Sequence, residues 1–324
     1  MRASFPPRLP LFALVLLGAA CGGTTGAPPG GGAPGGSDAS ASQGGDDAGS
    51  GTQPDGGDDA SVVNPPPPPP PTSAAFGTYI ALGDSISDRG GQGPFFYDLL
   101  LKNDATTYPA WAGHDLSTRF PGIQYVHGAV AGSITGPYGD VLTSGAPLMT
   151  TQVQGLGHSY PGDVLVTITI GGNDLNFHAG DAVTGLDAPD KQKFTANLKT
   201  LLDELTTPGR LGAGKVIIVE ANIYDASDGQ GNWQTGGGAA CPPYNVPGSQ
   251  DVGVFAAWNQ IISNGIGATG GIDRLLDLHA LFAGHGFNGQ DSWYFTDCIH
   301  PSQKGHHQLR REAWRLITGE TPAP

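Results

Sequence analysis

Charged residues are scarce in this sequence, and basic residues are the scarcer kind. Asp, Glu, Lys and Arg make up 14% of the 324 residues, with 29 acidic against 15 basic side chains. The formal net charge is therefore -14. A protein that binds nucleic acid needs a basic face, so the composition argues against a nucleic-acid partner.

Cysteine is also scarce, and the motifs of several enzyme classes are missing. The three cysteines are Cys21, Cys241 and Cys298, and no two of them have zinc-finger spacing. The sequence has no His-Glu-x-x-His pair and no glycine loop of the phosphate-binding type. These absences argue against the corresponding metal-dependent and nucleotide-dependent enzymes.

Residues 1–20 have the pattern of an export signal. Two arginines precede an apolar run that is too short to span a bilayer, and small residues follow at 18–20. Cys21 comes next, so the segment resembles a bacterial lipoprotein signal, in which this cysteine is lipidated and becomes the mature N-terminus. Gly18 departs from that pattern, which has a larger aliphatic residue there. Ordinary secretory cleavage is the alternative, and both predict an exported protein.

Residues 21–75 have a low-complexity composition that predicts a disordered tether. Positions 22–75 contain six Asp and no Lys or Arg, and they show no apolar periodicity that could offset the entropy of ordering. The unbroken proline run at 65–71 favours polyproline II. We expect a flexible acidic tether and a stiff spacer that hold a domain away from a membrane.

Residues 76–320 have the pattern of one folded domain. Apolar strands are predicted at 79–82, 123–126, 163–170, 215–221 and 275–278. Helices are predicted at 95–102, 194–205, 254–262 and 309–316. Continuous apolar strands that alternate with helices indicate a parallel sheet covered on both faces. In such folds ligands bind beyond the carboxyl ends of the strands.

Ser85 lies directly after the first predicted strand, in the sequence Gly-Asp-Ser at 83–85. A serine on a sharp turn past a buried strand has an exposed hydroxyl and nearby backbone N–H groups, which suits a nucleophile. The same residue types are common in ordinary turns, so this stretch alone does not establish a site.

Three further segments supply the partners that a nucleophilic serine needs. The segment 127–133 follows the second strand and contains two glycines, and Gly-Gly-Asn-Asp at 171–174 follows the third. Asp-Cys-Ile-His-Pro at 297–301 precedes the last helix. Independent turns have no reason to place these residue types in this order.

The combined pattern resembles the SGNH hydrolases, also called the GDSL esterase/lipase family, over nearly all of residues 77–318. The resemblance implies a flavodoxin-like three-layer α/β/α sandwich. It also implies that Ser85 is the nucleophile and that Asp297 and His300 complete a catalytic triad. Gly132 and Asn173 would join Ser85 in an oxyanion hole.

The chemistry of these residue types agrees with those roles. A serine hydroxyl is a weak nucleophile until a base takes its proton, and His300 can act as that base near neutral pH. Asp297 can orient the imidazole. Each oxyanion donor is typically worth about 3–4 kcal/mol in the transition state. We expect glycine at position 132 because it lets the backbone approach closely.

The segment 127–133 is the weakest match, because the family often has Asn where His127 stands. Gly128 is the alternative oxyanion donor if the alignment shifts. Asn173 has the alternative of a turn or helix-cap role. We expect Asp88 and Asp174 to cap local structure or to hold the catalytic loops.

Two other polar stretches receive no catalytic role. His306 and His307 are expected on the exposed start of the last helix. Residues 157–161 resemble a Gly-x-Ser-x-Gly elbow around Ser159, but Pro161 replaces the final glycine and no apolar strand precedes them.

The sequence predicts a monomeric serine hydrolase that cleaves carboxylic esters through an acyl-enzyme and requires neither metal nor organic cofactor. One alternative is a carbohydrate esterase that deacetylates polysaccharide, and another is a catalytically silent surface-binding domain. Four aromatic residues are candidates for sugar stacking: Trp233, Trp258, Trp293 and Tyr294. The glycine-rich segment 223–250 is a candidate substrate-facing loop.

Lipidation of Cys21 would leave two cysteines in an exported domain, and we expect Cys241 and Cys298 to form a disulfide. This bond would link the glycine-rich segment to the segment of His300. The alternative is a small buried Cys298 and a free Cys241 thiol.

Overall fold

The computed structural model describes residues 75–88, 95–229, 253–267, 271–287 and 289–322. All of them belong to one unit, Val63–Pro324. The predictions for the export signal, Cys21, the tether, Trp233 and Cys241 lie outside the described residues. Within the described ranges, no helix is long and apolar enough to cross a membrane.

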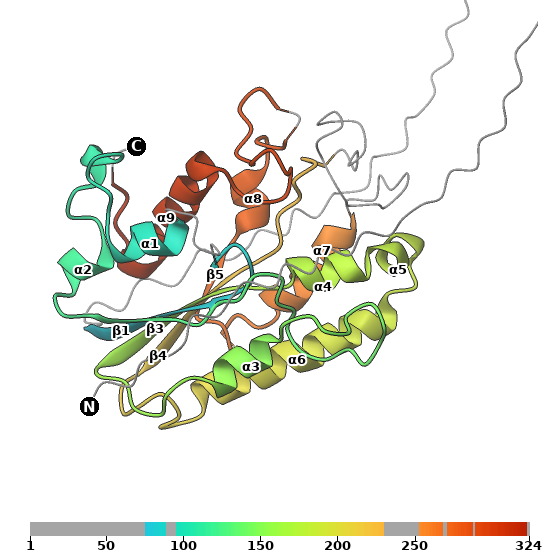
Figure 1. Ribbon diagram of the computed structural model, residues 1–324, viewed down its shortest axis with the longest axis horizontal. Coiled ribbons are helices and arrows are strands. Elements are labelled where there is room, and N and C mark those ends of the chain that lie inside the picture. The colour runs from blue at the N-terminus through green and yellow to red at the C-terminus, as the bar shows by residue number, and fades with distance from the viewer. Residues whose placement is uncertain (1–74, 89–94, 230–252, 268–270, 288, 323–324) are drawn as a thin grey trace, which may run out of the picture. The chain divides into compact units, whose positions relative to one another are not determined.

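A parallel sheet forms the centre of the described part of the chain (Figure 1), with its five strands in the order β2-β1-β3-β4-β5. The strands are β1 (Phe76–Gly83), β2 (Gln124–His127), β3 (Asp163–Thr169), β4 (Val216–Ala221) and β5 (Arg274–Leu276). All neighbouring strands pair in parallel. This is the flavodoxin-like strand order, so the predicted fold class is confirmed.

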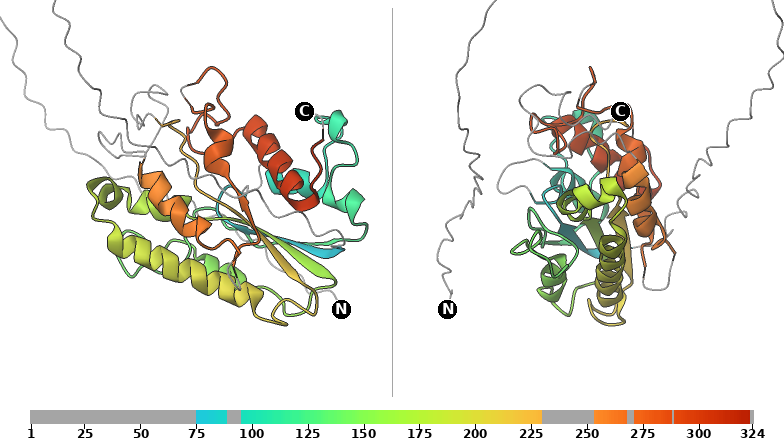
Figure 2. Two further views of the ribbon diagram at one scale, coloured as in Figure 1. Left: turned by 180° about the vertical axis from the view of Figure 1, so that it is seen from behind. Right: turned by 90° about the vertical axis from the view of Figure 1, so that its right-hand side faces the viewer.

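Helices cover both faces of the sheet. They are α1 (Phe96–Leu101), the 3-10 helix η1 (Pro109–Trp111), α2 (Leu116–Arg119), α3 (Met149–Gln154), α4 (Gly172–Phe177), α5 (Ala179–Thr184), α6 (Ala188–Thr206), α7 (Gly253–Ser263), α8 (Leu278–Phe282) and α9 (Gln303–Thr318). The helices α3, α6 and α7 lie on one side of the sheet, and α1, α8 and α9 lie on the other (Figure 2).

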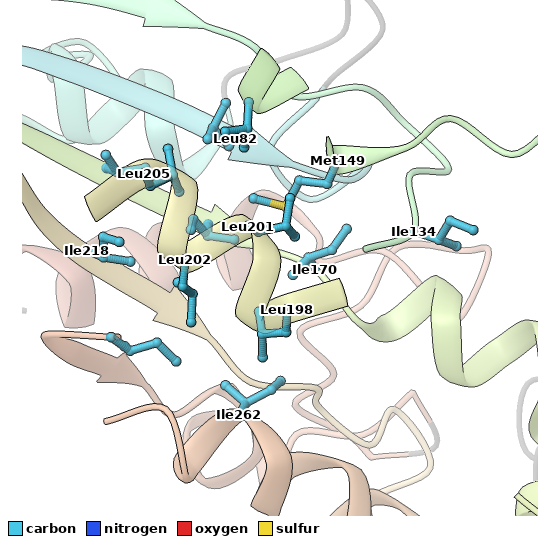
Figure 3. Close-up of a cluster of buried hydrophobic side chains, with 14 of the residues drawn as sticks. Leu82, Ile134, Met149, Ile170, Leu198, Leu201, Leu202, Leu205, Ile218 and Ile262 are labelled. Atoms are coloured by element: carbon cyan, nitrogen blue, oxygen red, sulfur yellow. The ribbon is translucent and has the colours of Figure 1, made fainter. Parts of the chain in front are cut away.

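The alternation of side chains along each strand divides the core into two clusters. In β1, Ile80 and Leu82 face the cluster that contains α6, whereas Tyr79 and Ala81 face the cluster that contains α9. Figure 3 shows the first cluster, in which leucines of α6 lie near Ile218 of β4. Both faces of the central strands are buried, which explains why most of their residues are apolar.

The strand order reverses between β1 and β3, because the chain leaves β1 for β2 on one side and later returns to β3 on the other. Ligands of doubly wound sheets bind at this position, beyond the carboxyl ends of the strands. Ser85 follows the end of β1, and Asn173 follows the end of β3. The topology therefore brings these two sequence-predicted residues to the same position.

The prediction for the start of the last helix is wrong. His306 is buried, with 4% of its surface exposed, and its ring packs 4.4 Å from that of Phe95. His307 is half-buried and stacks on Tyr108 at 4.2 Å. Both rings pack against the segment around α1 and η1. The packing of the ring surfaces therefore stabilises these positions more than burial of the ring nitrogens destabilises them.

Candidate active site

Ser85 stands in a turn that continues directly from β1. Gly83 has φ +127°, and a Cβ atom there would lie 2.1 Å from the carbonyl oxygen of Thr169, so only glycine fits this position. The N–H of Asp84 donates to the same carbonyl at 2.9 Å. These contacts hold the turn against the end of β3.

The buried side chain of Asp84 also supports the turn. Its Oδ1 accepts hydrogen bonds from the N–H of Ile86 at 3.0 Å and from the hydroxyl of Thr169 at 3.1 Å. Burial raises the pKa of Asp84 to about 7, although these hydrogen bonds and the nearby His300 act in the opposite direction. Asp84 therefore fixes the backbone of the turn that carries Ser85.

Ser85, His300 and Asp297 form a continuous hydrogen-bonded chain. The Oγ of Ser85 lies 2.7 Å from Nε2 of His300, and Nδ1 of His300 lies 2.7 Å from Oδ2 of Asp297. A carboxylate only accepts, so Nδ1 carries the hydrogen and the lone pair of Nε2 faces the serine hydroxyl. This arrangement allows the hydroxyl to donate its proton to His300.

The segment from Asp297 to His300 is held in a tight turn. Oδ1 of Asp297 accepts the N–H groups of Ile299 at 3.0 Å and of His300 at 2.9 Å. Cys298, between them, has φ +60°, in the left-handed region. The hydroxyl of Tyr224, which follows β4, donates to the carbonyl of Ile299 at 2.6 Å. The turn is therefore held by the segment that follows β4.

The electrostatics of the pair favour the charged form of each group. Partial burial raises the pKa of Asp297, but the hydrogen bonds from His300 and the backbone outweigh it, so the pKa is lowered. The hydrogen bond to Asp297 raises the pKa of His300, against the opposing effect of burial. Asp297 therefore stabilises an imidazolium at position 300.

Asn173 presents its carboxamide beside Ser85. It is the second residue of α4, and Gly171 occupies the N-cap position, so the helix-cap interpretation of Asn173 is wrong. Its Nδ2 donates one hydrogen to the carbonyl of Ser133 at 3.0 Å. The amide group has two hydrogens, and the second has no acceptor among the described residues, so it can donate to a ligand.

Glycine is favoured at position 132 for a different reason from the one expected. Its φ is +78°, but a Cβ atom there would meet nothing within 4 Å, so backbone conformation rather than close approach favours glycine. Among the described residues, no acceptor takes its N–H. Gly128 is excluded as the alternative donor, because its N–H already donates to the carbonyl of Ala81 at 2.9 Å.

Asp88, His127 and Asp174 hold the loops around Ser85. Asp88 accepts the N–H of Ala131 at 2.8 Å, and Asp174 accepts the N–H of Thr135 at 3.0 Å. Nε2 of His127 donates to a backbone carbonyl in the Ser85 turn at 2.8 Å. His127, which stands where the family often has Asn, is thus hydrogen-bonded to that turn.

Gln152, a buried residue of α3, was not among the sequence-predicted site residues. Its Nε2 donates to the hydroxyl of Ser133 at 2.9 Å, and its carboxamide also bonds to the backbone of Gly83. A single glutamine in a six-residue helix has no motif around it that could have marked it. Tyr224 was also missed, although its place after a strand end could have drawn attention to it.

Comparison with known proteins identifies the family. The model of the GDSL-like Lipase/Acylhydrolase family matches residues 81–308, which is more than half of the chain. The chain belongs to this family. It is therefore an ester-cleaving hydrolase. The comparison with curated proteins found no match.

Several solved structures are similar to this hydrolase. The lipase Lip_vut3 from a goat rumen metagenome has a TM-score of 0.46 and 16% identity, over 74% of this chain and 96% of that chain. The acetylxylan esterase Axe2 from Geobacillus stearothermophilus has a TM-score of 0.44 and 17% identity, over 77% of this chain and 98% of that chain. Phospholipase A1 from Streptomyces albidoflavus NA297 has a TM-score of 0.44 and 20% identity, over 77% of this chain and 100% of that chain.

A cavity of about 90 Å³ opens beside Ser85 in the hydrolase. His300 and Asn173 line it together with Ser85, whereas Gly132 does not. Most of the remaining wall is apolar and comes from the strand ends and from α4, α5 and α7. Within the described ranges, no group of three or more His, Cys, Asp or Glu side chains could hold a metal ion.

The three described aromatic residues among the candidates for sugar stacking do not line this cavity. Trp258 has no exposed surface and donates its indole N–H to Asp187 at 2.8 Å. Trp293 and Tyr294 are each 7% exposed and belong to the core cluster around α9. These three side chains fill the core, which is the commoner role of aromatic residues, and none of them is placed to stack on a sugar in this cavity. The predicted disulfide of Cys298 stays a prediction, because Cys241 lies outside the described residues.

Proposed function

We propose that this hydrolase cleaves carboxylic esters through an acyl-enzyme on Ser85. The chain of hydrogen bonds from Ser85 through His300 to Asp297, with 2.7 Å at each step, carries the proposal. A base within hydrogen-bond reach of the hydroxyl, itself oriented by a carboxylate, is the arrangement that activates a serine.

In the first half-reaction, Oγ of Ser85 attacks the ester carbonyl while its proton passes to Nε2 of His300. The carbonyl oxygen becomes an oxyanion, which the N–H groups of Ser85 and Gly132 and the free amide hydrogen of Asn173 stabilise. Collapse of this intermediate breaks the bond to the alcohol oxygen. His300 returns the proton to that oxygen, and the alcohol leaves.

In the second half-reaction, a water molecule attacks the acyl group on Ser85. His300 takes a proton from the water, and the same donors stabilise the second oxyanion. The acid product forms when the bond to Oγ breaks and the proton returns to Ser85. Asp297 stays ionised and stabilises the imidazolium in both steps.

Hydrolysis of p-nitrophenyl butyrate by two serine variants tests this proposal. Ser85→Ala should lose nearly all of the activity, because the attacking atom is gone. Ser159→Ala is the matched control, since Ser159 is exposed and lies in the stretch that only resembles a nucleophile elbow. Equal activities of the two variants would reject Ser85 as the nucleophile.

We also propose that the protein is exported and tethered to a membrane through a lipid on Cys21. The support is the sequence of residues 1–21, in which a short apolar run and small residues precede the cysteine. Membrane association that persists in a Cys21→Ala variant would contradict the tether.

A further inference from the structure

The cavity beside Ser85 has an apolar lining that three parts of the fold supply. Ile170 and Ile223 lie at the ends of β3 and β4, and Phe255 belongs to α7. Leu175 of α4 and Val183 of α5 provide the third part of the lining. The apolar surface therefore surrounds the space next to the nucleophile rather than forming a single wall.

The polar side chains in the cavity wall are largely engaged by the protein. Asn222 donates to Asp277 at 2.8 Å and accepts the N–H of His279 at 2.9 Å. The hydroxyl of Tyr224 is bonded to Ile299. A sugar ring placed against this part of the wall would replace few of its hydrogen bonds to water, whereas an alkyl chain has none to lose.

We propose that this cavity is an acyl-binding pocket that selects short acyl chains, with the best fit at about four carbons. The size follows from the volume. An apolar cavity of ~150 Å³ holds a benzene ring of six carbons, and the cavity here has about 90 Å³. Ser85, Asn173 and His300 line the same cavity, so by the same proportion it holds about four carbons in total, including the carbonyl carbon. This inference rests on the proposed function of Ser85.

The position of His300 distinguishes the acyl side from the alcohol side. His300 must protonate the leaving alcohol, so the alcohol lies on its side of Ser85. The side chain of His300 is 37% exposed, which gives the alcohol a route to solvent. The acyl chain, which stays attached to Ser85 between the two half-reactions, then occupies the apolar part of the cavity.

The test is the kcat/KM of the full-length protein for p-nitrophenyl esters from acetyl to dodecanoyl. Each added CH₂ that enters the pocket should raise kcat/KM about four-fold. The rise should end near the butanoyl ester, and longer chains should be poorer substrates. A maximum at acetyl, or equal values along the whole series, would overturn the inference.

Variants of Val183 test whether this pocket sets the preference. Val183→Trp fills the cavity and should move the maximum to the acetyl or propanoyl ester, whereas Val183→Ala should move it to longer chains. Val183 is half-buried, so the smaller variant provides the second measurement if the larger one fails to fold. Val141→Trp is the matched control, because Val141 is 89% exposed and does not line the cavity.

The outcomes separate the two proposals. An active wild-type enzyme whose acyl preference is unchanged in both Val183 variants overturns the pocket assignment and leaves the role of Ser85 intact. A folded wild-type protein that hydrolyses no ester in the series overturns the proposed function, and the acyl-pocket inference fails with it.

Discussion

Gln152 of α3 pairs with the backbone of Gly83 at the end of β1 through two hydrogen bonds. The N–H of Gly83 donates to Oε1 at 2.9 Å, and Nε2 donates to the carbonyl of Gly83 at 2.8 Å. Nε2 also reaches the hydroxyl of Ser133, whose carbonyl accepts from Asn173. One buried carboxamide therefore connects the strand before the nucleophile to the residue proposed for the oxyanion hole.

Replacement of Gln152 by Leu should affect both stability and turnover. The buried N–H of Gly83 would lose its partner, which costs about 1–3 kcal/mol in the free energy of unfolding. Loss of the link to Ser133 should also lower kcat more than it changes KM. The exposed Gln154→Leu in the same helix is the control. Unchanged kcat in a destabilised Gln152→Leu would limit Gln152 to a structural role.

Asn173→Ala should lower kcat by about 10²–10³, with a smaller change in KM, because the oxyanion exists only along the reaction. Steady-state kinetics on a butyrate ester measures both constants. Asn264→Ala, at a position outside the cavity lining, is the control for a general effect of the substitution. A change confined to KM would assign Asn173 to ground-state binding.

Asp297→Asn should change the pH dependence of kcat/KM as well as its size. His300 acts as a base only when neutral, and the hydrogen bond to Asp297 raises its pKa, so activity should rise as the pH increases through that pKa. Without the carboxylate the pKa should fall, and the acidic limb should move to lower pH. The loss of kcat should stay smaller than in His300→Ala. An acidic limb that does not move would mean that another group sets the pKa of His300.

Glu220 of β4 should make the stability of the fold depend on pH. It has no exposed surface, and neither of its carboxylate oxygens has a hydrogen-bond partner among the described residues. Burial raises its pKa from 4.5 to about 8. Between these two pKa values the folded protein keeps a proton that the unfolded chain has lost. The contribution of Glu220 to the free energy of unfolding is therefore fully present below about pH 4.5 and is lost as the pH rises through 8.

Glu220→Gln should therefore flatten the decrease in the free energy of unfolding between about pH 5 and 8. The decrease in the wild type is at most about 1.4 kcal/mol per pH unit from this group. Denaturant titrations at several pH values measure it. Asp203→Asn, at an exposed carboxylate paired with Lys199, should keep the wild-type slope. An unaltered slope in Glu220→Gln would show that Glu220 is ionised in the fold.

The sheet could be predicted from the sequence because its strands are buried on both faces. A run such as the one at 163–170 has no exposed position that could break its apolar pattern, and β3 occupies nearly the same residues. The helices α3, α4 and α5 were missed, since each has six residues and too few turns to show a period.

The site could be predicted only as far as strand ends and motifs allow. Ser85 and Asn173 lie where a parallel sheet places its ligands, and the family resemblance supplied Asp297 and His300. The link from Gln152 to Gly83 joins positions 69 residues apart, so it exists only in the folded chain. The error at His306 has the same origin, because the packing of a histidine on Phe95 depends on tertiary contacts.

Covalent labelling measures the central claim, the nucleophilic role of Ser85, most directly. The folded wild-type protein is treated with a fluorophosphonate probe, digested, and examined by mass spectrometry. We predict a single modified serine at position 85, no label in Ser85→Ala, and strongly slowed labelling in His300→Ala because the base is missing. A label on a different serine, or equal labelling of wild type and Ser85→Ala, would contradict the account.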